Sequence, residues 1–165
     1  MSNKFEFYSK SSTLKKLKPL LNLSRILPIY SFSVGSWKHN KKIIINGIRR
    51  KFNNKLIVRS SAIGEDTHFE SQAGKYLSIS NLDPNNQVKL SQSIKRVIKS
   101  YNSDNIENEI LVQPMLNKVS MSGVLFTQDN ESSAPYYCIE YDDLTGSTDT
   151  VTSGLNDKSR TLYIL

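Results

Sequence analysis

The chain has 165 residues, of which 38% are hydrophobic and 22% are charged, a composition typical of folded globular proteins and not of disordered ones. Its apolar runs, such as Ile43 to Ile45, are far shorter than the roughly 20 residues of a membrane span, and the N-terminus lacks the apolar core of a signal peptide. A single cysteine, Cys138, excludes an internal disulfide and a cysteine-based zinc site. We therefore expect a cytoplasmic protein with no membrane partner.

The formal net charge is +7, and the basic residues are concentrated at the front of the chain. Residues 1–60 contain 14 Lys and Arg against one acid, whereas residues 61–165 contain 8 bases and 14 acids. An excess of this kind is typical of a protein that meets an anion, such as nucleic acid, an acidic membrane surface or a polyphosphate nucleotide. Solvated helix faces are the simpler explanation for most single lysines. Because the lysines are not interleaved with exposed aromatic residues or set in a known motif, we do not expect a nucleic-acid partner.

The first hundred residues show mainly helical spacing. Leucines at helical intervals follow a Ser/Thr cluster and predict a basic amphipathic helix, and apolar residues between Trp37 and Ile48 predict another. Short apolar runs predict strands between the helices. The expected elements, in chain order, are a helix at about 11–22, a strand at 26–33, a helix around 37–48, strands at 55–60 and 75–80, and a helix at 86–101.

The rest of the chain reads as strands. Alternating apolar residues place them at 109–114, 120–127, 135–141, 148–153 and 160–165. Helices at the front and strands at the back give an α+β or α/β class. The final strand stops at the last residue, Leu165, with no turn or polar tail after it, so we expect a truncated chain.

One strand carries a cation at its expected end. An apolar run from Leu56 to Val58 leads to Arg59, which would place a guanidinium at a sheet edge where ligands collect in open α/β folds. The forked donors of an arginine can hold two phosphate oxygens at once. A salt bridge to Glu65 or Asp66 is an equally good explanation on spacing alone. Neither a P-loop nor a Rossmann glycine motif occurs in the chain.

Four segments in order carry a family resemblance. Residues 59–74 contain the sequence RSSA, then Glu65-Asp66, then Ala73-Gly74, and residues 122–127 read SGVLFT. The earlier segment KSSTL at 10–14 and the later VQPM at 112–115 agree as well. These segments resemble the N-terminal ATP-binding domain of the phosphoenolpyruvate synthase and pyruvate phosphate dikinase family. The resemblance implies an ATP-grasp-like fold, with an N-terminal lobe at 1–108 and an incomplete C-terminal lobe at 109–165.

The resemblance also implies roles for single residues. Lys10 and Arg59 match the family lysine and arginine that contact the phosphates of ATP, and they are the candidate catalytic residues. Ser78 stands where relatives keep a phosphate-contacting threonine. Gln113 and Met115 match the hinge segment that holds adenine, although ordinary strand packing would also explain them. ATP is thus the expected cofactor.

Departures from the family pattern limit this interpretation. The acidic motif that supplies Mg²⁺ ligands in the family is absent, so we expect those ligands in a missing C-terminal part. The acids Glu140, Asp142 and Asp143 align elsewhere and are poor candidates for the metal, and His39 and His68 match no family histidine. The expected partners are a nucleotide and the remaining domains of a longer enzyme, which carry the histidine and the acceptor site.

The segments YDDLTG at 141–146 and TDTVTSG at 148–154 are similar to a branch found with bacterial surface-polysaccharide enzymes. That branch includes the L-glutamine kinase of capsule biosynthesis, in which ATP is split to AMP and phosphate and a phosphoryl group passes through a histidine to the acceptor. A phosphoenolpyruvate synthase or other dikinase fragment is an alternative. A non-catalytic nucleotide-binding or regulatory module is another.

Overall fold

The computed structural model describes residues 8–64, 76–129, 132–148, 150–152 and 159–165. The chain divides into two compact units, Met1–Met115 and Leu116–Leu165, which are treated separately below. In the described part of the chain, no helix combines the length and the apolarity needed to cross a membrane.

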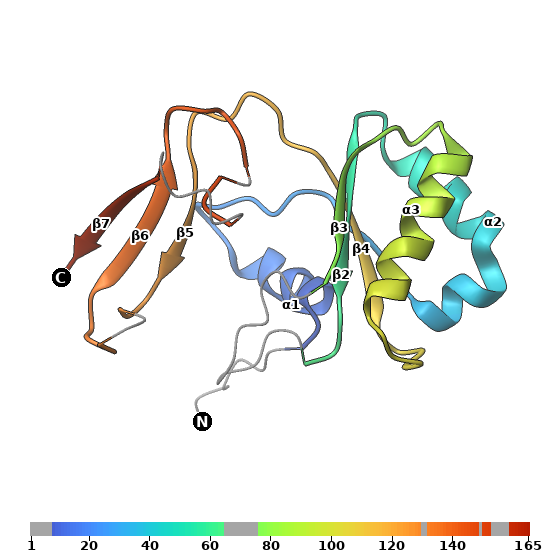
Figure 1. Ribbon diagram of the computed structural model, residues 1–165, viewed down its shortest axis with the longest axis horizontal. Helices are drawn as coiled ribbons and strands as arrows, with labels where there is room; N and C mark the ends of the chain where they lie inside the picture. Colours follow the sequence, from blue (N-terminus) through green and yellow to red (C-terminus); the bar gives the residue numbers. More distant parts are fainter. Residues whose placement is uncertain (1–7, 65–75, 130–131, 149, 153–158) are drawn as a thin grey trace. The chain divides into compact units, whose positions relative to one another are not determined.

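The first unit is built around a four-stranded sheet in which every neighbouring pair of strands is antiparallel. Helices α2 and α3 lie on one face of this sheet, and helix α1 lies on the other (Figure 1). A short 3-10 turn, η1, follows α1 directly. The strands in sheet order are β1 (Tyr30–Ser33), β4 (Glu109–Pro114), β2 (Leu56–Ser61) and β3 (Ser78–Leu82); the helices are α1 (Lys10–Leu17), η1 (Lys18–Leu20), α2 (Val34–Lys51) and α3 (Gln87–Ser100).

The hydrophobic core lies between the sheet and the α2/α3 helix layer. Alternate residues of β2 and β4 point into it, among them Leu56, Val58 and Val112, which are fully buried. Helix α3 contributes three fully buried residues at helical spacing, Leu90, Ile94 and Val97. Burying an aliphatic side chain of this size stabilises the fold by about 1.5–3 kcal/mol. The core therefore fixes which faces of β2 and β4 point away from these helices.

The α-helices α1, α2 and α3 each begin with a polar side-chain cap. Ser9 accepts a hydrogen bond from the Ser12 amide at the start of α1, Ser33 caps α2 in the same way, and Asn86 caps α3 through the Lys89 amide. Each such cap is worth about 1 kcal/mol. The residue types that favour caps therefore set where the helices begin.

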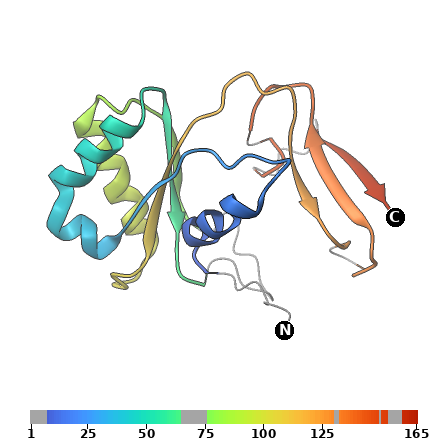
Figure 2. The ribbon, with the colours of Figure 1, turned by 180° about the vertical axis from the view of Figure 1, so that it is seen from behind.

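The second unit contains a three-stranded antiparallel sheet in the order β5-β6-β7, with strands Ser122–Phe126, Tyr137–Asp142 and Arg160–Ile164. Gly123 is required where β5 meets β6, because a Cβ atom there would lie 2.4 Å from the carbonyl oxygen of Glu140. The carboxylate of Asp142 accepts hydrogen bonds from the hydroxyl of Thr145 and from the amides of Leu144 and Thr145. These bonds hold the turn after β6, and Figure 2 shows this strand from the opposite side to Figure 1.

The mixture of helices and antiparallel strands confirms the expected α+β class. Two elements differ from the sequence-based expectation. The described residues among 148–153 form bends and turns where a strand was expected. Strand β4, which the sequence assigned to the second lobe, pairs with β1 and β2 and belongs to the first unit.

Helix α1 begins near its expected position, but its buried face is polar. The predicted apolar stripe of leucines is only partly buried: Leu14 and Leu17 in α1 are half-buried and Leu20 and Leu21 beyond it are exposed, whereas Ser11 and Thr13 are buried. The leucine spacing was therefore an incomplete signal for what holds this helix. Hydrogen bonds to the sheet also hold it, as described below.

Candidate functional site

Arg59 lies within β2 and not at its end, because the strand continues to Ser61. The expectation of a guanidinium at the carboxyl edge of a sheet was wrong, since that rule concerns parallel sheets and this sheet is antiparallel. Alternation along β2 instead places Arg59 on the face that also carries Ile57 and Ser61, opposite the α2/α3 core. The candidate site is therefore a sheet face.

A row of residues crosses this face. Cα pairing aligns Ser31 on β1 with Leu111 on β4, Leu111 with Arg59 on β2, and Arg59 with Ser78 on β3. Residues paired directly across antiparallel strands have Cβ atoms about 4.5–5.5 Å apart and point to the same side. The structure thus brings Arg59 and Ser78 together.

Arg59 is half-buried, and its side chain has no ion pair or hydrogen bond with another residue in the described ranges. Its alternative partners from the sequence, Glu65 and Asp66, lie outside the described residues, as do Ala73 and Gly74 of the same motif. Ser78 is exposed beside it. A half-buried guanidinium beside an exposed hydroxyl can bind an anion without first breaking a described salt bridge.

Gln113 lies on β4, on the same face as Arg59 and two residues after Leu111, the residue that pairs with Arg59. It pairs with Ile57, so its Cβ atom is a diagonal neighbour of that of Arg59 at about 7–8 Å. Met115 follows β4, and its amide donates a hydrogen bond of 2.7 Å to the carbonyl oxygen of Lys55. The Met115 amide is therefore already paired, while its carbonyl and side chain are the groups left for a ligand.

Lys10 is the first residue of α1, which lies over this same face (Figure 1). The next residue, Ser11, is fully buried, and its amide donates a 2.8 Å hydrogen bond to the hydroxyl oxygen of Ser61. Ser61 is two positions from Arg59 on β2 and points to the same side. The hydrogen bond between Ser11 and Ser61 therefore lies next to Lys10 in the chain and two residues from Arg59.

A further residue of this face was not identified from the sequence. The Oε2 atom of Glu109, the first residue of β4, accepts hydrogen bonds from the hydroxyls of Ser9, Ser11 and Ser12. Glu109 pairs with Ser61 across the sheet. The only sequence signal was an acid at the start of the apolar run ILV, which a surface position would explain equally well.

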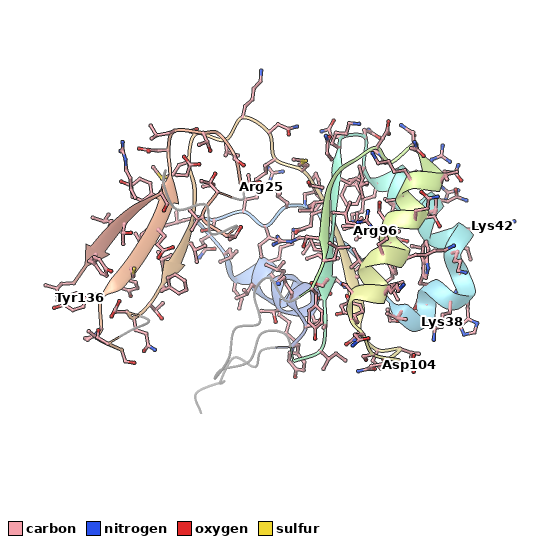
Figure 3. The ribbon with its side chains drawn as sticks, in the orientation of Figure 1. Arg25, Lys38, Lys42, Arg96, Asp104 and Tyr136 are labelled. Atoms are coloured by element: carbon pink, nitrogen blue, oxygen red, sulfur yellow. The ribbon has the colours of Figure 1, made fainter. Side chains whose placement is uncertain are left out.

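The basic residues are not gathered on this face. Helix α2 contains six Lys and Arg, helix α3 contains four, and neither contains an acid. Both helices cover the opposite side of the sheet, and Lys42 projects from α2 away from it (Figure 3). The charge excess of residues 1–60 therefore describes a helix surface at least as much as it describes the candidate site.

The remaining candidates from the sequence are engaged in other ways. Asp142 is buried, and the hydroxyls of Thr145 and Thr150, followed by the amides of Thr145 and Leu144, hold its pKa well below the usual range. Asp143 forms an ion pair of 2.9 Å with Arg160. His39 lies exposed on α2, on the far side of the sheet from Arg59, and His68 lies outside the described residues.

One hollow of about 260 Å³ lies in the segment between η1 and β1, lined by Lys18, Ser24, Arg25, Ile26 and Pro28. Its volume falls just below the roughly 300–1,000 Å³ of ligand pockets. None of the five residues matched to the family lines it. This hollow is therefore separate from the candidate site.

Comparison with known families gives one match that covers more than half of the chain. The model of the pyruvate phosphate dikinase AMP/ATP-binding domain matches residues 39–142. The matched range includes Arg59, Ser78, Gln113 and Met115, whereas Lys10 precedes it. No curated protein sequence matches the chain. The chain belongs to the family of the pyruvate phosphate dikinase AMP/ATP-binding domain.

Proposed function

We propose that the sheet face bearing Arg59 and Ser78, together with the start of α1, binds the polyphosphate of ATP. The observation that supports this most directly is the cross-strand pairing of Arg59 with Ser78 on the face covered by α1. Family membership supports a nucleotide as the ligand. In this proposal the guanidinium of Arg59 and the ammonium of Lys10 bind phosphate oxygens, and the hydroxyl of Ser78 donates a further hydrogen bond.

Electrostatics favours this assignment. A cation and a phosphate oxygen 4 Å apart attract each other by about 4 kcal/mol at an effective dielectric constant of 20, and by about 1 kcal/mol in bulk water. Arg59 is half-buried, so its attraction falls between these limits. Cations at these positions would also neutralise the charge that builds on a transferred phosphoryl group. Positioning and such electrostatic stabilisation account for most of the catalysis of phosphoryl transfer.

Gln113 and Met115 are proposed to hold adenine. Gln113 is a diagonal neighbour of Arg59, so a base placed over it would leave the phosphates directed along the face toward Arg59 and Ser78. Because the Met115 amide is paired with Lys55, Met115 would act through its carbonyl oxygen and by covering the base with its side chain. Both residues are half-buried, as partial contact with a ligand requires.

Among the described residues, no cluster of three or more His, Cys, Asp or Glu could hold a metal ion. Asp142 and Asp143 are occupied by the turn after β6 and by Arg160. The described residues therefore do not fit a Mg²⁺ site.

We further propose that the chain serves an ATP-dependent phosphotransferase of the phosphoenolpyruvate synthase type, in which ATP is split to AMP and phosphate. The phosphoryl group would pass through a histidine on another domain, as the family resemblance implies, and His39, the histidine among the described residues, lies on the far side of the sheet. The motifs at 141–154 favour an L-glutamine kinase for capsular polysaccharide, with phosphoenolpyruvate synthase or another dikinase as the alternative acceptor chemistry. A non-catalytic nucleotide-binding or regulatory module is the second candidate, because the described residues lack both a metal site and a histidine on this face.

Equilibrium titration tests nucleotide binding. We expect the full chain to bind ATP more tightly than triphosphate or adenosine alone, with a Kd below about 1 mM, or about −4.1 kcal/mol. Absence of saturable binding to ATP in that range would contradict the proposal. Equal affinity for ATP and adenosine would show that the phosphates do not contribute to binding.

Phosphorus NMR separates the enzyme from the binding module. The chain is incubated with ATP and Mg²⁺, with either L-glutamine or pyruvate added, and the phosphorus spectrum is followed. Formation of AMP, phosphate and a phosphorylated glutamine would support the kinase assignment. Binding of ATP with an unchanged spectrum would support the non-catalytic module, or a chain that needs the histidine domain of a partner.

A further inference from the structure

The start of α1 is joined to the sheet through one carboxylate oxygen. Glu109 Oε2 accepts hydrogen bonds from Ser9, from Ser11 at 2.8 Å and from Ser12 at 3.1 Å. These hydroxyls belong to the N-cap and first turn of α1, and Lys10 stands among them. Hydrogen bonds to an ionised acceptor are shorter and stronger than those between neutral groups.

The main chain of Glu109 is fixed from the opposite side of the sheet. The hydroxyl of Tyr101, the residue that caps α3, donates to the carbonyl oxygen of Glu109 and accepts from the Ser61 amide at 3.1 Å. Ser61 in turn receives the Ser11 amide on its hydroxyl oxygen. Glu109 and Ser61 are paired across β4 and β2, so two bonded routes connect the core side of the sheet to α1.

Apolar packing holds α1 only in part, because its two leucines, Leu14 and Leu17, are half-buried and not fully buried. The two residues of α1 that are buried, Ser11 and Thr13, are polar, and the leucines that follow in η1 and beyond it are exposed. An eight-residue helix is not stable by itself in water. The fully buried contacts of α1 are therefore polar, and the Glu109 carboxylate accepts three hydrogen bonds from its N-cap and first turn.

We infer that Glu109 is a positioning residue for the nucleotide site: its carboxylate holds the first turn of α1 on the sheet and so places Lys10 over the face that carries Arg59. This inference rests on the proposed nucleotide function, since it assigns Glu109 a role in the same site. Glu109 does not contact the ligand in this account. It acts through Ser9, Ser11 and Ser12.

The test uses Glu109→Ala, Glu109→Gln and a matched control, Glu107→Gln. Glu107 is exposed two residues earlier, so its substitution removes the same charge without touching α1. Amide hydrogen exchange is measured on the full chain for peptides from α1, β2 and β4. We expect Glu109→Ala to speed exchange in α1 by about tenfold while β2 and β4 keep their wild-type rates. Glu109→Gln, which keeps one acceptor oxygen, should show a smaller change in the same direction, and Glu107→Gln none.

ATP titration provides the second readout, through a double-mutant cycle with Lys10→Ala. In the wild-type background Lys10→Ala should weaken ATP binding by about tenfold, and in the Glu109→Ala background by less than about twofold, because the lysine is no longer held in place. A purely structural role for Glu109 would lower stability but leave the cost of Lys10→Ala the same in both backgrounds. That equality would overturn the inference, as would wild-type exchange rates in α1 of Glu109→Ala.

The two proposals can fail separately. If the wild-type chain does not bind ATP, the proposed function and the nucleotide part of this inference are both overturned, while the exchange rates still decide whether Glu109 holds α1. If Glu109→Ala does not fold, Glu109→Gln is carried through both measurements, with an unchanged α1 exchange rate counting against the inference.

Discussion

Replacing Arg59 with methionine tests the phosphate site at its best-defined position. Methionine keeps an unbranched apolar stem and removes the charge and all five donors. Since the Arg59 side chain has no hydrogen-bond or ion-pair partner in the described part of the chain, the substitution should change the free energy of unfolding by less than about 0.5 kcal/mol. A loss of ATP affinity would therefore report on the site and not on the fold.

The expected magnitude follows from the exposure of the guanidinium. Coulomb attraction at 4 Å spans about 1 kcal/mol in water to about 4 kcal/mol near a protein surface, and a half-buried group falls near 2 kcal/mol, or about 30-fold in Kd. Isothermal titration with ATP measures the affinity, and thermal unfolding without nucleotide measures the stability. Lys89→Met is the matched control, because Lys89 is exposed on α3, on the opposite face of the sheet from Arg59. An equal loss of affinity in both variants would show that only net charge matters and would refute the assignment of Arg59.

Three further predictions concern single side chains. Ser78→Ala should weaken ATP binding by about fivefold, the loss of about 1 kcal/mol for one hydrogen bond at an exposed site, and an unchanged Kd would remove Ser78 from the site. Gly123→Ala should destabilise the second unit by about 1–3 kcal/mol in denaturant unfolding, because its Cβ would lie 2.4 Å from the Glu140 carbonyl oxygen. A wild-type unfolding midpoint would contradict this, since it would show that β5 and β6 accommodate the added methyl group at no cost in stability. The pKa of Asp142 is lower in the folded protein than in the unfolded chain, so its contribution to stability is present at neutral pH and is lost as the pH falls below about 4. Asp142→Asn should accordingly lower Tm at pH 7 by more than at pH 3, and an equal shift at both pH values would contradict the role of the carboxylate.

The apolar pattern predicted most of the elements because their burial is repetitive. Helices α2 and α3 each bury residues at intervals of three and four, and strand β4 at Glu109–Pro114 lies where the sequence placed it. Local patterns of this kind depend on a residue's own neighbours. They do not specify which strands pair, and the assignment of β4 to the first sheet follows only from its pairing with β1 and β2.

The candidate site was predictable only in part, for the same reason. The motif match singled out Arg59 and Ser78, and strand pairing explains why residues 19 positions apart meet. The role of Glu109 depends on contacts with serines about 100 residues earlier, which no local pattern reveals. The leucine spacing of α1 suggested apolar packing, whereas the buried residues of that helix are a serine and a threonine. The basic excess of the first 60 residues was also a poor guide to the site, since six of those 14 bases belong to α2 on the opposite side of the sheet.

The central claim is that ATP phosphates bind between the start of α1 and the β2–β3 face, and NMR mapping of an ATP titration tests it most directly. We predict shifts in the amides of Lys10, Ser11 and Ser78 and in the Nε resonance of Arg59, with α2 and α3 unaffected. Lys38 and Lys42 on α2 and Arg96 on α3, all labelled in Figure 3, belong to the helix layer with ten bases and no acid, which is the natural competitor for a polyanion. Shifts confined to those helices would contradict the account.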